Sequence, residues 1–290
     1  MGEILNGELS DAALESGGYS RRQIAQAVSP RLQELIILPT EKCNLRCTYC
    51  YEDFAIGRMS EETQAALEAF IAQRVPGLVK LSLNWFGGEP LVAKVVVLRI
   101  SRFAQKVCEE HNVQFDGALT TNAVVLDKEL LSELLDCRQN FYQITLDGWG
   151  ETHDQVRKYA DGRGSFDQIW QNLTSFKSLD RDFEVMIRVH VRRENLKELP
   201  ALLTALGAEF GGDNRFRVHF EHLRDLGGEG GKTILSPVTR SELLGMEAGF
   251  RAIFREAAIN AGHILQPGSP AVWDQRIAGP ATGLMGYWPY

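Results

Sequence analysis

The stretch LIILPTEKCNLRCTYC (residues 35–50) joins a short apolar run to three closely spaced cysteines. Cys43, Cys47 and Cys50 follow the spacing C-x3-C-x2-C, and the other two cysteines of the chain lie far from them. Four apolar residues before Pro39 are typical of a buried strand. The stretch therefore predicts a strand that leads directly into a loop whose thiols bind a metal ion or a metal cluster.

Short apolar runs of the same kind recur along the chain. Each is bounded by turn residues and is rich in Ile, Val, Leu and Phe, which favours strands of a parallel sheet that are buried on both faces. Together with the first run, the expected strands cover residues 35–38, 81–86, 115–120, 141–146, 185–191 and 216–220.

The stretches between these runs predict helices with one apolar face. We expect helices to begin after Ser60, at Pro90, after Asp127, at a capping box of Ser165 and Gln168, after Asn195 and at Ser236-Pro237. The helix that begins at Pro237 should end near Gly262. A short helical pattern also covers residues 21–28.

Strands that alternate with helices in this way form right-handed crossovers and a parallel sheet. Six units are too few for a full (β/α)8 barrel, so the expected fold is α/β, a partial (β/α)6 TIM-like barrel with parallel strands. We expect residues 1–31 to form an N-terminal extension, residues 32–262 the barrel core, and residues 263–290 a tail without a clear element.

Composition excludes several classes of protein. The chain has 290 residues and a formal net charge of −7, which argues against a nucleic-acid partner because phosphate binding needs a basic surface. No apolar run reaches about 18 residues, so we expect no membrane span. The acidic N-terminus lacks the features of a secretory signal. Five cysteines, an odd number, argue against a disulfide framework and favour a reducing compartment, the cytoplasm.

The cysteine loop allows two kinds of metal site. Three thiolates at the end of a barrel strand can each bind one iron of a cubane [4Fe–4S] cluster, which leaves the fourth iron open. The alternative is a structural zinc site, but such sites have four ligands, usually from two paired knuckles, and no second knuckle exists here. Cys108 and Cys137 lie in expected helices, where they are more simply small buried hydrophobic residues.

A second motif follows the second expected strand. Residues 87–90 read GGEP, and two glycines let the backbone approach a ligand closely. The cysteine loop and this segment, in this order, resemble the radical S-adenosylmethionine (SAM) superfamily over about residues 33–225. The resemblance implies that Cys43, Cys47 and Cys50 bind three irons of a [4Fe–4S] cluster and that SAM binds the fourth.

The same resemblance implies the reaction and part of the SAM site. Reduction of the cluster cleaves SAM to a 5′-deoxyadenosyl radical, which takes a hydrogen atom from the substrate. Tyr49 matches an aromatic position near the adenine. Gly87, Gly88 and Glu89 match the loop that holds the SAM amino group. Asn122, in residues 120–123 (TTNA), matches a T-N-G segment with Ala in place of Gly, and faces SAM or the substrate if it points into the cleft.

Residues 145–166 resemble the peptide-modifying branch of this superfamily, whose members usually carry a C-terminal SPASM or twitch domain. The matching residues of this segment are Thr145, Asp147, Gly148, His153, Asp154, Arg157 and the run GRGSF at 162–166. The match implies that Thr145 bonds the SAM carboxylate or ribose, places Asp147 among the SAM-binding candidates, and leaves Arg157 or Arg163 to pair with the carboxylate.

Several of these residues also have a purely structural interpretation. Asp147 and Arg157 could form a structural ion pair, Ser165 could only cap its helix, and His153 could be structural. Arg188 shares one face of its strand with His190, and its partner is either the SAM carboxylate or a local Glu. Candidates for the substrate end of the cleft are His219, Glu221 and His222, and the sequence assigns no catalytic acid or base.

The sequence thus predicts a radical SAM enzyme that modifies a peptide or protein side chain, with a flavodoxin- or ferredoxin-type reductant as partner. Two alternatives remain: sulfatase-maturase-like protein oxidation, and a non-catalytic iron–sulfur protein for electron transfer or assembly. The peptide substrate rests on residues 145–166 alone. No cysteine follows Cys137, so we expect either an enzyme with one cluster or a chain that lacks an auxiliary-cluster domain.

Overall fold

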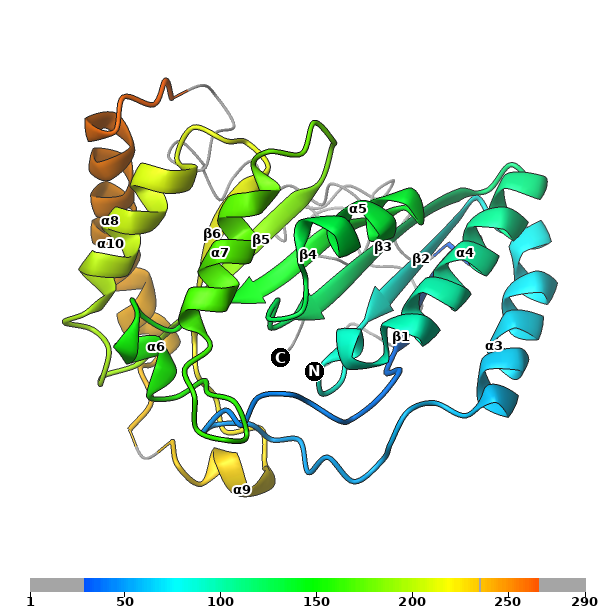
Figure 1. The fold of residues 1–290 in the computed structure, drawn as a ribbon, viewed down its shortest axis with the longest axis horizontal. Coiled ribbons are helices and arrows are strands. Elements are labelled where there is room, and N and C mark those ends of the chain that lie inside the picture. Colours follow the sequence, from blue (N-terminus) through cyan, green and yellow to red (C-terminus); the bar gives the residue numbers. More distant parts are fainter. Residues whose placement is uncertain (1–28, 235, 266–290) are drawn as a thin grey trace, which may run out of the picture.

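The computed structural model describes residues 29–234 and 236–265 (Figure 1). Six parallel strands form one sheet in the order in which they occur in the chain. They are β1 (Leu32–Ile37), β2 (Lys80–Trp85), β3 (Gln114–Thr121), β4 (Gln139–Thr145), β5 (Glu184–Val191) and β6 (Phe216–His222). Each connection crosses over through helical structure, so the expected partial (β/α)6 barrel is confirmed.

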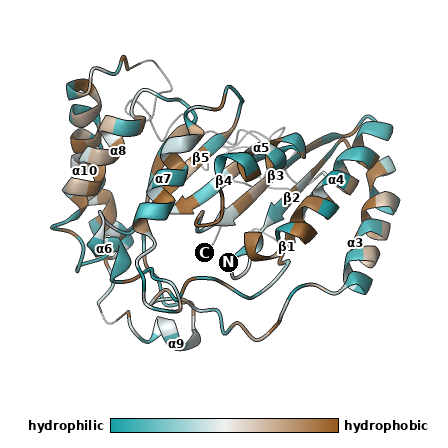
Figure 2. Cartoon of the chain, in the orientation of Figure 1, coloured by the Kyte–Doolittle hydropathy of each residue, from teal (hydrophilic) through white to brown (hydrophobic). Residues whose placement is uncertain are grey.

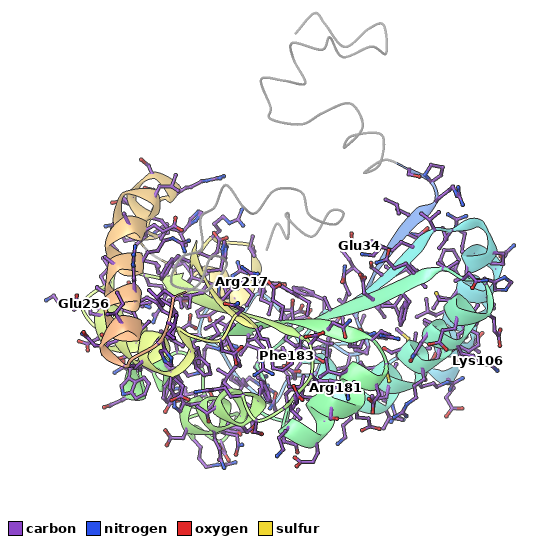
Figure 3. All side chains as sticks on the ribbon, turned by 90° about the horizontal axis from the view of Figure 1, so that it is seen from above. Glu34, Lys106, Arg181, Phe183, Arg217 and Glu256 are labelled. Atoms are coloured by element: carbon purple, nitrogen blue, oxygen red, sulfur yellow. The ribbon has the colours of Figure 1, made fainter. Side chains whose placement is uncertain are left out.

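Helices cover one face of the sheet and flank both of its ends (Figures 1 and 3). The longer ones are α3 (Glu61–Arg74), α4 (Lys94–Glu110), α5 (Lys128–Asp136), α7 (Phe166–Phe176), α8 (Leu199–Phe210) and α10 (Arg240–Asn260). Short turns of helix are α6 (Glu151–Asp154), α9 (Gly228–Gly231) and the 3-10 segments Val75–Gly77 and Pro90–Ala93. None of the described helices is long and apolar enough to cross a membrane.

The core lies between the sheet and these helices. Alternate side chains of the strands, among them Leu83, Trp85 and Ile187, are fully buried there, and apolar burial of this kind is the main stabilising contribution to a fold. Figure 2 shows hydrophobic stretches along the central strands and mixed faces on the helices. Cys108 and Cys137 are buried, as expected.

The other face of the sheet is polar, which the apolar runs did not predict. Glu34 and Arg217 lie on the side away from α4 and α7 (Figure 3), and Gln143 and Arg188 are buried polar side chains of the central strands. Strand β1 also departs from the expectation of burial on both faces, since Ile36 is 57 % exposed. The reason is that Ile36 shares the face of Glu34, away from the helices, and that β1 is an edge strand with a neighbour on one side only.

The helix starts expected after Ser60, Asp127 and Ser165 are confirmed. Pro90 opens a 3-10 turn before α4, and α8 and α10 begin further along the chain than expected. The backbone N–H of Thr63 donates to Ser60 Oγ (3.1 Å) at the start of α3, and that of Leu130 donates to Asp127 Oδ1 (2.8 Å) at the start of α5. Helix α10 begins at Arg240 rather than at Pro237, because Thr239 forms a capping box with Glu242.

The expected caps at Ser165 and Asn195 are wrong. Asp154 Oδ1 accepts hydrogen bonds from the N–H groups of Ser165 and Phe166, so Asp154 caps α7 from outside the helix. Helix α8 begins only at Leu199, with Pro200 in its first turn, and Asn195 donates to backbone carbonyls instead. The side chains of Ser165 and Asn195 thus form tertiary hydrogen bonds in place of caps.

Some expectations fall outside the described residues. They are the helical pattern at 21–28, most of the N-terminal extension 1–31, and most of the tail 263–290 with Trp273, Trp288 and Tyr290.

The contact between α8 and α10 depends on a glycine. A Cβ at Gly207 would lie 2.2 Å from the carbonyl oxygen of Phe254, whereas a Cβ at Gly249, which is exposed on α10, would meet nothing within 4 Å. We expect Gly207→Ala to lower the free energy of unfolding by about 1–3 kcal/mol, because the added methyl group separates the helices.

The matched control is Gly249→Ala, which we expect to raise the free energy of unfolding by about 1 kcal/mol through helix propensity. Chemical denaturation of both variants measures the two effects. Equal stabilisation of both would contradict the close packing of α8 on α10.

Candidate active site

The cysteine loop lies where the carboxyl ends of the six parallel strands meet. It follows β1 directly, and its three thiols are free and partly buried. Leu45 anchors the loop in the core with only 1 % of its surface exposed. On the outer side, Arg46 Nη1 donates to the carbonyl oxygens of Cys43 (2.8 Å) and Leu45 (2.7 Å). The loop is therefore wrapped around its own buried leucine.

A second backbone segment runs along the cysteine loop. The N–H groups of Arg46 and Thr48 donate to the carbonyl oxygens of Lys158 (2.7 Å) and Val156 (2.9 Å), and Leu45 forms an antiparallel bridge with Tyr159. The segment after α6 is thus a wall of the cysteine loop. This explains why two stretches about 110 residues apart in the chain belong to one site.

The glycines after β2 support the loop from another side. The N–H of Gly88 donates to Thr40 O (3.3 Å) and that of Glu89 to Lys42 O (3.0 Å). A Cβ at Gly88 would lie 2.1 Å from Glu41 O, so a side chain has no room there. The close approach that the sequence predicts for Gly88 is made in this structure to the backbone of the chain itself.

The turn α9 supports the loop from a third side, next to the loop that leaves β1 (Figure 1). A Cβ at Gly230 would lie 2.2 Å from Cys50 O, and one at Gly228 would lie 2.7 Å from Tyr51 O. Thr233 Oγ1 donates to Thr48 O (3.2 Å). Sequence reasoning missed this contact, although the run GGEGG at 227–231 was a visible signal for close backbone packing.

Four polar side chains meet beneath the loop. Tyr49 donates its hydroxyl hydrogen to Asp147 and accepts a hydrogen bond from Arg157 Nη1 (2.8 Å). His190 Nδ1 lies 3.0 Å from Asp147 Oδ1 and 3.2 Å from the Tyr49 hydroxyl. Arg157 Nε lies 3.9 Å from Asp147 Oδ2. The structure thus brings together Tyr49, Asp147 and Arg157 from the sequence candidates, and it adds His190.

The charges in this group follow from burial and from neighbouring groups. Burial raises the pKa of Tyr49 well above its ordinary value, so the phenol keeps its proton. Burial opposes ionisation of Asp147, but His190 and Arg157 outweigh it and hold the pKa of Asp147 well below its usual range. Burial lowers the pKa of His190, which is therefore neutral at pH 7. Asp147 and Arg157 are the remaining ionised pair.

The thiols are protonated in the absence of metal. Burial raises the pKa of Cys43 to about 12, and it also raises the pKa values of Cys47 and Cys50. The charge of Arg157 acts in the opposite direction on all three thiols. A metal site forms here by replacing thiol protons with metal ions, and Arg157 favours the anionic thiolates that result.

A buried hydrogen-bond chain fixes Arg157 from behind. The N–H of Asp147 donates to His153 Nδ1 (3.2 Å), and His153 Nε2 lies 3.1 Å from Ser165 Oγ, which donates to Arg157 O (2.7 Å). Burial, followed by the charge of Arg157, lowers the pKa of His153 to about 3, so this ring is neutral. His153 and Ser165 hold the backbone of Arg157, which is a structural role for both.

A second polar group lies on the other side of the cysteine loop, around Glu89. Its buried carboxylate accepts hydrogen bonds from Thr121 Oγ1 (2.7 Å), from the N–H of Asn122 (2.7 Å) and from the N–H of Leu91 (3.0 Å). Asn122 Nδ2 in turn donates to Asn44 Oδ1 (2.8 Å) and points at Cys43 Sγ (3.7 Å). Glu89 and Asn122 therefore meet next to the first cysteine.

The remaining candidates lie further away. Thr145 and Arg188 are register neighbours on β4 and β5, and Arg188 Nη2 lies 3.9 Å from Glu221 Oε2. His222 Nδ1 lies 3.0 Å from Glu221 Oε1, on the same strand end. Arg163 is not brought into the site: its side chain is 71 % exposed and pairs with Asp161 (2.8 Å).

The donor set fits an anionic cluster better than a single metal ion. Within residues 29–234 and 236–265, no three His, Cys, Asp or Glu side chains gather as the ligands of one ion do. Each thiolate that binds a [4Fe–4S] cluster binds a different iron, so the three sulfurs do not need to point at one common position. Asn44 Nδ2 and Arg157 Nε are buried nitrogens without a hydrogen-bond partner in the described part of the chain, next to the cysteines. These two nitrogens could donate hydrogen bonds to a bound group that carries acceptor atoms.

Comparison with known proteins finds a matching family model and several related proteins. The family model described as Radical SAM superfamily matches residues 37–206, more than half of the chain. Fe-coproporphyrin III synthase of Methanosarcina barkeri is 24 % identical over 175 residues, which cover 59 % of this chain and 40 % of that protein. Cysteine-type anaerobic sulfatase-maturating enzyme of Clostridium perfringens strain 13 is 24 % identical over 165 residues, 54 % of this chain and 44 % of that protein.

A solved structure described as native anSMEcpe with bound AdoMet and Kp18Cys peptide has the same fold. Its TM-score is 0.61 at 21 % identity, and the match covers 81 % of this chain and 63 % of that chain. This chain spans less than half of the length of the two curated relatives named above.

The contact between α9 and the cysteine loop yields a test. We expect Gly230→Ala to displace Cys50, because the added Cβ overlaps its backbone, and to lower the iron bound per chain after anaerobic reconstitution. Gly57→Ala is the matched control, since a Cβ at Gly57, seven residues beyond Cys50, meets nothing within 4 Å.

Iron and sulfide analysis of both variants and of the wild type measures the effect, with circular dichroism to confirm folding. Full iron content in Gly230→Ala would contradict a supporting role for α9.

Proposed function

Because the chain belongs to the radical SAM superfamily, whose cofactors are a [4Fe–4S] cluster and SAM, we propose that it modifies a peptide or protein side chain. When reduced, these cofactors supply a radical that removes a hydrogen atom from the substrate. The observation that carries the radical chemistry is the loop with three cysteines at the carboxyl ends of the strands, which backbone contacts to three other segments hold in place.

Cys43, Cys47 and Cys50 are the proposed cluster ligands. Their loop is fixed by backbone hydrogen bonds to residues 156 and 158 and by close contacts with Gly88 and Gly230. Arg157 supplies a buried positive charge, which lowers the free-energy cost of placing the negative charge of the cluster in the protein. No fourth cysteine accompanies them, because Cys108 and Cys137 are buried in the core.

The proposed SAM site lies next to this loop. The ring of Tyr49 is held edge-on to His190 (5.3 Å between centroids), which fixes one side of the position proposed for the adenine. Thr145 and Arg188 offer a hydroxyl and a guanidinium on neighbouring strands, and they are the proposed partners of the SAM carboxylate or ribose together with Arg157. Gly87, Gly88 and Glu89 remain the proposed contact for the amino group, and Asp147 orients Tyr49 and Arg157.

The peptide substrate has two supports. Residues 145–166 match the pattern of peptide-modifying members, and the relatives include a sulfatase-maturating enzyme and a structure with a bound peptide. Sulfatase-maturase-like oxidation of a protein is the second candidate, favoured by the same relatives. A pure electron carrier is less suited, since it would close its cluster with a fourth protein ligand. We further propose a flavodoxin- or ferredoxin-type reductant and a cytoplasmic location.

The test combines SAM cleavage with mass spectrometry of a peptide. The reconstituted protein, a chemical reductant and SAM are incubated anaerobically with each short peptide that the genes next to its own encode. We expect formation of 5′-deoxyadenosine and a change in peptide mass. Cys47→Ala should abolish both, because it removes one cluster ligand, while Cys108→Ala, at a buried site in α4, should keep SAM cleavage.

The outcomes separate the parts of the proposal. Formation of 5′-deoxyadenosine without a change in any neighbouring peptide would reject the peptide substrate and keep the cluster assignment. Undiminished SAM cleavage in Cys47→Ala would reject the cluster assignment itself.

A further inference from the structure

We infer that the side-chain amide of Asn122 sets the redox potential of the cluster through an N–H···S hydrogen bond to Cys43. The inference rests on the proposed role of Cys43 as a cluster ligand. Asn122 Nδ2 lies 3.7 Å from Cys43 Sγ and 2.8 Å from Asn44 Oδ1. A neutral amide that reaches one ligand sulfur acts on the charge of the cluster without occupying a coordination position.

The amide of Asn122 has no freedom to turn away. The residue is 5 % exposed and follows β3 directly. Its Oδ1 accepts from the N–H of Val124 (3.0 Å), and its own N–H donates to Glu89 Oε2 (2.7 Å). With the oxygen fixed on Val124, the NH2 group must face the cysteine loop. The orientation is therefore built into the turn that ends β3.

One backbone and one side-chain amide group point at the sulfur of Cys43. The N–H of Leu45 donates to Cys43 Sγ (3.3 Å), and Asn122 adds a second donor. Asn44 accepts from Asn122, while its Nδ2 is buried and has no hydrogen-bond partner among the described residues. Asn122 thus presents an N–H group to Cys43, whereas Asn44 turns its amide oxygen toward the Cys43 thiol (3.8 Å).

The sign of the effect follows from electrostatics. Reduction transfers one electron from an external reductant to the cluster and makes its sulfurs more negative. A hydrogen bond to a ligand sulfur is stronger in that state, so it stabilises the reduced cluster and raises the potential. Loss of the amide should therefore shift the potential to a lower value and make the cluster harder to reduce.

A different explanation is that Asn122 only holds the turn after β3. Asn172 on α7 provides the comparison, because its Nδ2 donates to the carbonyl oxygens of Ala123 (2.8 Å) and Val124 (3.1 Å). It supports the same turn, but none of its hydrogen bonds reaches a cysteine. Replacing Asn172 disturbs the turn and leaves the N–H···S bond from Asn122 to Cys43 in place.

The experiment is a redox titration of the reconstituted protein, followed by electron paramagnetic resonance of the reduced cluster. Wild type, Asn122→Ala, Asn122→Asp and Asn172→Ala are compared at equal iron content. We expect a lower midpoint potential in both Asn122 variants, with the larger shift in Asn122→Asp because it adds a negative charge. Asn172→Ala should stay near the wild type.

A potential that is unchanged in Asn122→Ala, or that shifts equally in Asn172→Ala, overturns the inference. A wild type that binds no [4Fe–4S] cluster overturns the proposed function instead. The wild type alone gives a second readout that survives misfolding of the variants. Asparagine labelled with ¹⁵N only in the side-chain amide should give a hyperfine coupling to the reduced cluster, and its absence would also overturn the inference.

Discussion

A buried guanidinium is the constraint on which the rest of the site depends. Burial opposes the charge of Arg157, but the ionised carboxylate of Asp147 lies beside it and the Tyr49 hydroxyl accepts its hydrogen bond, and the pKa of Arg157 stays well above the ordinary value. A charge in the interior is stable only beside an opposite charge and hydrogen-bond acceptors. Arg157 therefore ties the end of β4, where Asp147 lies, to the cysteine loop, where Tyr49 lies, and it gives both a fixed orientation.

Backbone contacts, together with the ion pair of Arg157 and Asp147, hold the cysteine loop in place. The segment with Arg157 hydrogen-bonds along the cysteine loop, Gly88 packs beneath it, and Gly230 packs beside it. The last of these brings the turn after β6 to the loop after β1, so the first and last units of the open barrel touch at the carboxyl ends of the strands. A loop held in this way presents its thiols with little freedom, which favours binding of a preassembled group.

The sequence predicted what depends on local patterns. Six short apolar runs predicted six strands, and the caps at Ser60 and Asp127 need only partners three residues away. Ser165 and Asn195 have the same chemistry, but their hydrogen bonds go to His153 and Arg157, and to Asp147 and His190. Only the folded chain brings these partners close. Likewise, the glycines at 227–231 indicate close backbone packing, but only the folded chain shows that the partner of Gly230 is Cys50.

The central claim is that the buried charge of Arg157 makes the cysteine loop a cluster site. The most direct measurement is the iron and sulfide content of Arg157→Gln after anaerobic reconstitution, with Arg99→Gln, a half-exposed arginine paired with Glu68, as control. The account predicts about four irons per chain in the wild type and the control, and a clear deficit in a folded Arg157→Gln protein. Full, stable loading of Arg157→Gln would contradict it.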